Sequence, residues 1–406
     1  MAVTDIAPGG PSPRGQEEAP PKVALLNNPK VRSWLFQIVL GVVVAYLVYA
    51  GWVNMNANLQ AAGVASGFGF LDENAGFSVA QSLIEYDQGT SSYGRVYVVG
   101  VLNTLVVAFI GIILATVIGF IVGIARLSNN WIVSRLATAY VEFLRNLPLL
   151  LQIFIWYFGV LRLLPGPRES FDFGPLGLLN NRGYFAPKPV WGDGSIAILI
   201  ALVAGLAIAF GVSRWAHKRQ MATGERFPAF WVGLGAIVGL PLLAFVATGA
   251  PLTFDVPEMG GFRPSGGMTV IPEFIALLVA LSTYTAAFIA EIVRAGILGI
   301  SRGQSEAAHA LGLRQGQNLR LVIIPQALRI IIPPLTSQYL NLTKNSSLAV
   351  AIAYPELTSV FAGTALNQTG QAVEIISITM LTYLTFSLLT SAFMNWYNAR
   401  VALVER

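Results

Sequence analysis

The chain has 406 residues, of which 55% are hydrophobic and 11% are charged, far fewer charged residues than the roughly 25% of a soluble globular protein, so we interpret it as an integral membrane protein. The net charge of +5 comes from Lys and Arg spread among apolar segments without clustered aromatic platforms, so we expect no nucleic-acid partner. The chain has no cysteine and only two distant histidines, His217 and His309, which excludes disulfides and predicts neither a metal site nor a bound cofactor.

The N-terminal part predicts a tail followed by an anchor. We expect a disordered tail over residues 1–33, since residues 1–21 are rich in Pro, Gly and charge and cannot bury a core. The first apolar run, 34–53, carries Trp34 and Trp52 at its ends, where amphipathic rings prefer the membrane interface. It lacks the short apolar stretch and small-residue cleavage site of a secretory signal. Residues 34–94 are therefore predicted to form an anchoring span and a polar periplasmic loop.

Further apolar runs predict an all-α polytopic membrane protein with about eight spans in total. Two segments rich in Pro and Gly, 165–194 and 250–270, are predicted to be loops, and 126–146 is amphipathic. The spans after the first are expected at 96–125, 147–164, 195–213, 229–249, 271–293, 318–343 and 371–396.

The distribution of basic residues predicts the orientation. Of the Lys and Arg residues, 18 fall on the side of the two termini and 7 on the other side. Cytoplasmic loops carry an excess of Lys and Arg, so we expect both termini and the loop around Glu306 to face the cytoplasm. The loops around Arg95, Arg162 and Arg182 are then expected outside.

The stretch 291–345 contains a short polar helix between two apolar ones. Ser301 followed by Gln304 has the spacing of a capping box, and Gly312 is suited to end the helix in a left-handed conformation. We therefore expect a helix over 302–311 of roughly 15 Å, which is too short to cross a membrane. From these residues alone, an amphipathic loop that merely joins two spans is also a valid interpretation.

The ordered residues of this stretch carry a family resemblance. Glu306, Ala307 and Ala308, with Gly312 and Pro325 further on, resemble the EAA loop of binding-protein-dependent ABC importer permeases. Val322 and Ile324 stand for the isoleucine and leucine of that pattern. The surrounding runs AEIVRAGI, SRGQSEAAHALGL and IIPQALRIIIPPL resemble the polar amino acid subfamily, especially the larger permease subunits of general L-amino acid importers.

The resemblance implies a type I ABC importer transmembrane domain over 95–397, with an inserted region at about 160–270. It implies a permease subunit that translocates L-amino acids across the inner membrane. The implied partners are two cytoplasmic ABC ATPases, a second permease subunit in a heterodimer, a periplasmic amino-acid-binding protein and membrane lipid. The chain has no GxxxxGK[ST] sequence, so we expect a non-catalytic subunit. The implied coupling helix to the ATPase comprises Ser301, Gln304, Glu306, Ala307, Ala308, Gly312 and Pro325.

The seventh span is unusually polar. Polar groups are costly against lipid, so they are expected to face protein or a water-filled path. Helix packing is the alternative, since Ser, Thr and Asn also hold membrane helices together. Pro333 and Pro334, with Pro325, are expected to kink the span. The residues that we expect to line a translocation path are Thr336, Gln338, Asn341 and Lys344.

A second class of function is a self-sufficient secondary carrier or channel for small polar solutes. Such a carrier normally shows internal repeats and an intramembrane carboxylate relay. No repeat is visible, and Glu273, Glu291 and Glu374 all lie near predicted span ends. Glu291 with Arg294, and Glu142 with Arg145, are three apart and can form local ion pairs on a helix.

Overall fold

The computed structural model describes residues 29–61, 67–225, 227–260 and 263–401, so most of the tail expected over 1–33 lies outside the described residues. The chain divides into two compact units, residues 1–66 and 67–406. The described part of the first unit is one helix, α1 (Pro29–Ala61), which begins five residues before the apolar run. Within α1, Arg32–Met55 is long and apolar enough to cross a membrane.

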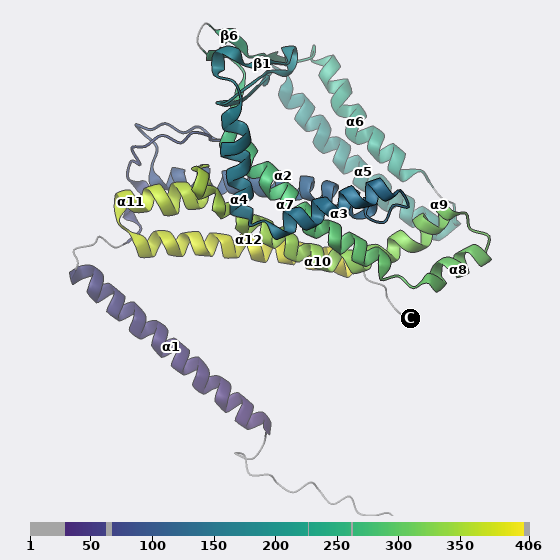
Figure 1. Ribbon diagram of the computed structural model, residues 1–406, viewed down its shortest axis with the longest axis horizontal. Helices are drawn as coiled ribbons and strands as arrows, with labels where there is room; N and C mark the ends of the chain where they lie inside the picture. The colour runs from purple at the N-terminus through teal and green to yellow at the C-terminus, as the bar shows by residue number, and fades with distance from the viewer. Residues whose placement is uncertain (1–28, 62–66, 226, 261–262, 402–406) are drawn as a thin grey trace, which may run out of the picture. The chain divides into compact units, whose positions relative to one another are not determined.

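The second unit is mostly helical (Figure 1). In the described part of the chain, seven helices are long and apolar enough to span a membrane, or eight if one bent pair forms a single span. The expectation of about eight spans is thus confirmed. The α-helices of this unit are α2 (Tyr93–Ala125), α3 (Trp131–Asn146), α4 (Leu149–Phe154), α5 (Ser195–Thr223), α6 (Ala229–Ala247), α7 (Pro272–Leu298), α8 (Arg302–Ala310), α9 (Gln315–Asn318), α10 (Ile324–Asn345), α11 (Leu366–Thr369) and α12 (Ala372–Val401).

The bent pair joins α3 to the segment that starts with α4, at an angle of 106°. Pro148 lies at the bend, where its ring and missing amide hydrogen prevent α3 from continuing. Shorter 3₁₀ and π-helical turns fill several connections. The 3₁₀ turns are Gly69–Asp72, Leu161–Leu163, Pro167–Glu169, Gly174–Leu176 and Ser346–Ile352, and the π-helical turns are Ile155–Val160, Leu319–Ile323 and Thr358–Ala365.

Helices α2 and α7 pack closely at the centre of the second unit. Gly111, Ala115, Gly119 and Gly123 recur every four residues along α2, and all four are buried. A side chain added at Gly119 would place its Cβ 2.5 Å from Ile289 Cγ2, so only hydrogen fits there. Small residues at this spacing let two membrane helices approach closely, which is the main source of packing energy where water does not drive association.

The apolar core gathers around this helix pair. The largest cluster draws side chains from α2, α4, α7 and α10, and a second cluster lies around Phe70 and Phe361. Fully buried members of the first cluster are Val107, Ala115, Ile153, Ala276, Leu277, Ala280, Leu281, Ile289, Leu342, Ala349 and Tyr354, and those of the second are Val96, Leu357, Phe361, Ala365 and Ile375.

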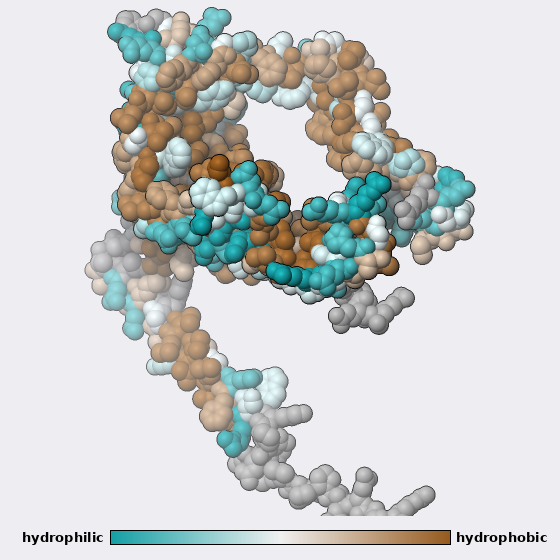
Figure 2. All heavy atoms as spheres, turned by 45° about the vertical axis from the view of Figure 1, so that its right-hand side comes forward, coloured by the Kyte–Doolittle hydropathy of each residue, from teal (hydrophilic) through white to brown (hydrophobic). Residues whose placement is uncertain are grey.

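Helices α5 and α6 form an antiparallel hairpin whose members pack on each other. A Cβ at Gly205 of α5 would lie 2.5 Å from the Ala236 carbonyl oxygen of α6, so the two backbones nearly touch. Most other side chains of the hairpin are exposed and apolar, as suits contact with lipid. Figure 2 shows an open space between the hairpin and the rest of the second unit.

The segments 165–194 and 250–270, expected to be loops, instead contain short antiparallel strands. Strands β1, β2, β3 and β8 form one sheet in that order, with Tyr184 opposite Val270, while β4 pairs with β5 and β6 with β7. These strands are too short to show alternation, and the partner of β3 on one side, β8, lies more than eighty residues away, so little local signal predicts them. The strands are β1 (Phe171–Asp172), β2 (Leu178–Asn180), β3 (Gly183–Ala186), β4 (Lys188–Trp191), β5 (Leu252–Asp255), β6 (Glu258–Gly260), β7 (Arg263–Ser265) and β8 (Met268–Val270).

The contact between α2 and α7 predicts the effect of one substitution. Gly119→Val should lower the free energy of unfolding by about 1–3 kcal/mol or more, because the new side chain must displace Ile289. The matched control is Gly211→Val in α5, where nothing lies within 4 Å of an added Cβ. Thermal unfolding of each purified variant measures the effect, and equal midpoints for the two variants would contradict the packing argument.

Candidate functional site

The 291–345 stretch runs from the end of α7 through α8, α9 and the π-helical turn 319–323 into α10. The short helix is α8, Arg302–Ala310, which ends one residue earlier than predicted. Figure 1 shows α8 at the periphery of the second unit, beyond the ends of the long helices. Its inner side packs against the turn 319–323 and α9, where Ala308 is buried.

The capping box expected at the start of α8 is wrong. Ser301 occupies the N-cap position, but its side chain makes no capping hydrogen bond. The Gln304 side chain does not return to the Ser301 amide, because its Oε1 accepts a hydrogen bond from Gln326 Nε2 at 3.2 Å. Gln304 thereby joins α8 to α10, a tertiary contact that local spacing could not reveal.

The end of α8 agrees with the prediction for Gly312. Its φ of +77° is left-handed, which glycine adopts at little cost. The Leu313 amide donates to the Ala308 carbonyl at 3.1 Å, satisfying an acceptor that the helix end leaves free. Because nothing lies within 4 Å of an added Cβ, the restriction at Gly312 is the backbone conformation itself.

The outer side of α8 carries one charged residue and a small apolar face. Glu306, Ala307 and Ala310 are exposed, and Leu311 is 81% exposed. Ala307, Ala310 and Leu311 are three and four residues apart, so they lie on one face of the helix. An exposed leucine beside two alanines is a surface that a partner protein could cover.

Pro325 lies near the beginning of α10, directly after the π-helical turn 319–323. Its missing amide hydrogen falls where the π-helical turn passes into the α-helix, a position at which the regular hydrogen-bond ladder is already interrupted. Pro333 and Pro334 lie inside α10, and the helix runs through both. Gln315–Ile352 forms one candidate span that includes all three prolines.

The polar residues of α10 differ in their exposure. Ser337, Asn341 and Lys344 are exposed and recur four and three residues apart, so they form one stripe along the helix, which we call the polar stripe. Thr336 and Gln338 are half-buried, about 100° to either side of Ser337. Of the four predicted lining residues, the structure thus places Asn341 and Lys344 on one exposed stripe and the other two at its flanks.

Four charged residues meet where α2 and α3 end against the last third of α7. Glu291 accepts a hydrogen bond from Arg126, and it lies 3.2 Å from Arg294 and 3.7 Å from Arg145. Arg145 thus reaches Glu291 of α7 rather than Glu142 of its own helix. This charge cluster holds three helices together at the end of α7 that leads into α8, so the local pairing expected for Glu291 is only part of its role.

Sequence reasoning missed a buried carboxylate between α10 and α12. Glu356 is fully buried, and it accepts hydrogen bonds from the amides of Thr358 and Ser359 and from the Tyr383 hydroxyl, each at 2.8 Å. It caps the helical turn Thr358–Ala365. The run Pro-Glu-Leu-Thr-Ser at 355–359 was the available signal, since a carboxylate before free amides is typical of a helix start.

The same segment explains two buried polar residues in the first half of α2. Asn103 Nδ2 donates to the Pro355 carbonyl at 2.7 Å, and Thr104 Oγ1 accepts from the Leu357 amide at 3.1 Å. A Cβ at Gly100 would lie 2.9 Å from the Leu357 Cα, so α2 contacts this backbone directly. These side chains therefore position the connection between α10 and α12.

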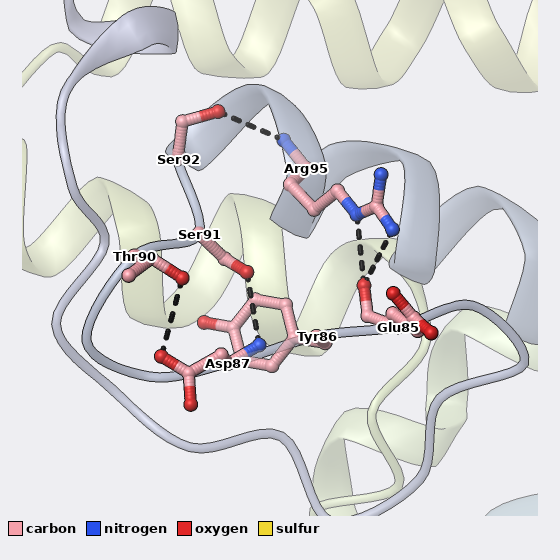
Figure 3. Close-up of a pocket in the computed structure, with 7 residues that line it drawn as sticks. All are labelled: Glu85, Tyr86, Asp87, Thr90, Ser91, Ser92 and Arg95. Atoms are coloured by element: carbon pink, nitrogen blue, oxygen red, sulfur yellow. Dashed lines mark hydrogen bonds between the residues drawn. The ribbon is translucent and has the colours of Figure 1, made fainter.

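A hollow of about 630 Å³ lies at the start of α2 (Figure 3). Its polar groups largely bond one another: Arg95 Nε donates to the Glu85 carbonyl at 2.9 Å, and Thr90 Oγ1 donates to Asp87 Oδ1 at 3.2 Å. The Tyr86 hydroxyl donates to the Phe77 carbonyl at 2.6 Å, and burial raises its pKa. We interpret the hydrogen-bonded segment that lines this hollow as a rigid support for the start of α2.

Comparison with known proteins identifies the family. Residues 226–403 match the family described as the binding-protein-dependent transport system inner membrane component. The chain is 56% identical to the General L-amino acid transport system permease protein AapQ of Rhizobium johnstonii, over 94% of this chain and 95% of that protein. It is 54% identical to the Putative amino-acid ABC transporter permease protein YhdX of Escherichia coli, over 93% and 96%.

A third relative is the Glutamate/glutamine/aspartate/asparagine transport system permease protein BztB of Rhodobacter capsulatus, 41% identical over 95% of this chain and 99% of that protein. These similarities extend over nearly the whole of each chain, and the number of candidate spans agrees with a polytopic membrane protein. The chain therefore belongs to the family of amino-acid ABC transporter permeases that carry the binding-protein-dependent inner membrane component.

Proposed function

We propose that this chain is the non-catalytic membrane subunit of an importer that carries L-amino acids across the inner membrane, driven by separate ATPase subunits through α8. The observation that carries the proposal is the exposed face of α8, where Ala307, Ala310 and Leu311 lie beside Glu306. A rigid, short helix with an uncovered apolar face can both bind a partner and transmit its displacement, whereas a flexible loop would absorb it.

Two contacts would carry a displacement of α8 into the membrane helices. The hydrogen bond between Gln304 and Gln326 joins α8 to α10. The charge cluster around Glu291 joins the end of α7 to α2 and α3. Movement of α8 would therefore reach α10 through the Gln304 contact and α7 through the short connection 299–301, and the charge cluster would pass the movement of α7 on to α2 and α3.

The polar stripe of α10 supports a role in that path. Ser337, Asn341 and Lys344 would each be costly against lipid, so a second protein surface or water must meet them when the protein lies in the membrane. We propose that a second permease subunit faces this stripe and that Thr336 and Gln338 flank the path between the two subunits.

The remaining partners follow from the family and its named relatives. We propose two ATPase subunits bound beneath a heterodimer of permeases, and a periplasmic binding protein that delivers amino acids. Relatives named for general L-amino acid transport support a broad set of substrates. We assign the permease domain to 95–397, the anchor and its loop to 34–94, and the inserted region to about 160–270, which includes the α5–α6 hairpin and the strands.

The first prediction of this proposal concerns Gly312. Gly312→Val should reduce ATP-driven uptake about tenfold, because a β-branched residue at φ +77° is strained by roughly 1–3 kcal/mol and the end of α8 must rearrange. Gly316→Val is the matched control, since Gly316 has helical backbone and open space around an added Cβ. Uptake into proteoliposomes containing the whole complex is measured; unchanged uptake in the Gly312 variant refutes the coupling role of α8.

Glu306 tests the same surface by its charge. Glu306→Lys should leave the membrane fold intact, because the side chain is exposed, yet should weaken co-purification of the ATPase by placing the opposite charge in the contact. Thermal unfolding provides the control for folding. A variant that retains the ATPase in normal ratio would show that Glu306 lies outside the contact.

Asn341 tests the path. Asn341→Leu should lower uptake several-fold while the complex keeps its normal subunit ratio, because an exposed amide of the polar stripe is replaced by an apolar group. Val350→Leu, also at an exposed position, is the control for added bulk. Loss of subunits in the Asn341 variant, with no separate effect on uptake, would mean that the stripe serves packing.

The orientation can be tested with single cysteines, since the chain has none of its own. Ser305→Cys should react with a membrane-impermeant thiol reagent only from the cytoplasmic side, and Ser78→Cys only from outside. Ser78 is exposed, so its reaction is limited by the membrane alone. Reversed labelling would contradict the orientation and place α8 away from ATP.

A further inference from the structure

A second polar hollow, of about 370 Å³, lies at the end of α7 opposite to α8. It is bounded by the segment that follows α4, by the start of α7 and by the turn between β2 and β3. Helix α7 has 27 residues, so the hollow is roughly 40 Å from α8 along that helix. We call it the α4–α7 hollow; its lining residues are Tyr157, Arg162, Asn181, Arg182, Ile271, Pro272 and Glu273.

A carboxylate and a guanidinium are held side by side in this hollow. The buried Tyr157 hydroxyl donates to Glu273 Oε1 at 2.7 Å and accepts from Arg162 Nη2 at 3.1 Å. The Arg162 guanidinium also lies over the Tyr157 ring, 5.2 Å from its centre. Because both charged groups reach the same phenol oxygen, the carboxylate and the guanidinium are at most about 6 Å apart. One phenol therefore fixes two opposite charges within reach of one small molecule.

Two further groups of the hollow have unused bonding capacity. Within the described residues, the Arg182 guanidinium has no hydrogen-bond or ion-pair partner. Only the backbone amide of Arg182 is engaged, since it donates to Asn180 Oδ1 at 2.8 Å. The neighbouring Asn181 Oδ1 is buried and receives no hydrogen bond. A buried acceptor without a donor is destabilising, so a ligand that supplies a donor there would be stabilised. In the hollow of Figure 3, by contrast, the Arg95 guanidinium is already bonded to a carbonyl.

We propose that the α4–α7 hollow binds a free α-amino acid as its zwitterion, before the amino acid enters the path between the permeases. Arg182 and Arg162 bind the α-carboxylate, since guanidinium groups match carboxylates with two parallel hydrogen bonds. Glu273 and Asn181 Oδ1 accept from the α-ammonium. The inference rests on the proposed transport function, and it adds a substrate site on the side expected to face outward.

The arrangement favours a small zwitterion over a protein side chain or a simple ion. An anion alone would leave Glu273 unpaired near its own charge, and a cation alone would meet two arginines. A molecule that carries both charged groups on one carbon atom, as an α-amino acid does, satisfies all four groups at once. Side chains of different sizes fit this mode of binding, because only the groups common to all α-amino acids are recognised.

The test measures binding without transport. The complete permease–ATPase complex is purified without ATP and without the binding protein, and binding of radiolabelled L-glutamine is measured. We expect unlabelled L-glutamine to compete, while its α-amide and N-acetylglutamine compete at least about tenfold more weakly, since each lacks one charge. Equal competition by all three would overturn recognition of a zwitterion.

Variants of the hollow provide the second arm. Arg182→Gln and Glu273→Gln should each weaken binding about tenfold or more, whereas Lys188→Gln, which removes an exposed cation of β4 outside this hollow, should not. Unchanged affinity in both hollow variants overturns the proposal. The proposal is also overturned if Arg182→Gln lowers only the affinity of the complex for the binding protein and leaves amino-acid binding unchanged. The hollow would then be a docking contact.

Transport by the wild-type complex keeps the two proposals distinct. If ATP and binding protein drive no uptake, the proposed function fails irrespective of what the hollow binds. If uptake occurs but no amino acid binds to the complex alone, the substrate site is wrong and the transport function stands.

Discussion

The close contact between α2 and α7 is the constraint on which the rest of this structure depends. In an apolar medium, the hydrophobic effect does not draw helices together, so shape must supply the attraction. Gly119 meets Ile289 at a distance that leaves no room for a methyl group. The recurrence of small residues along α2 fixes the register of the two helices, and α4 and α10 then pack around them.

Helix α7 connects the two ends of the proposed mechanism. Toward one end, Glu291 forms ion pairs with arginines of α2 and α3, in the part of α7 that leads to the short helix that would meet an ATPase. At the other end, Glu273 shares the Tyr157 hydroxyl with Arg162 in the α4–α7 hollow. A rigid helix of this length transmits a tilt or a translation from one end to the other without a hinge, so events at the two surfaces can be coupled through it.

Buried polar groups organise the connection after α10. Glu356 is retained in the interior because three donors compensate its removal from water, and Asn103 and Thr104 of α2 hold the neighbouring backbone. The polar stripe of α10 has a different environment, since Asn341 and Lys344 remain exposed in a single chain. The two sets of polar residues therefore have different roles. The first set stabilises the subunit from within, and the second is available to contact a neighbouring subunit or water.

Several features followed from the sequence alone, because their causes are local. Continuous apolar runs predicted the spans, and glycine at position 312 predicted a left-handed helix end that the structure has. Ordered motifs around Glu306 indicated the family, which the relatives then established. Other features depended on tertiary contacts. Gln304 bonds to Gln326 and not to the expected cap, and Arg145 pairs with Glu291 and not with Glu142. Strand β3 pairs with β8, although two helices separate them in the chain. In each case the deciding partner is distant in the chain, and only the folded backbone brings it within bonding distance.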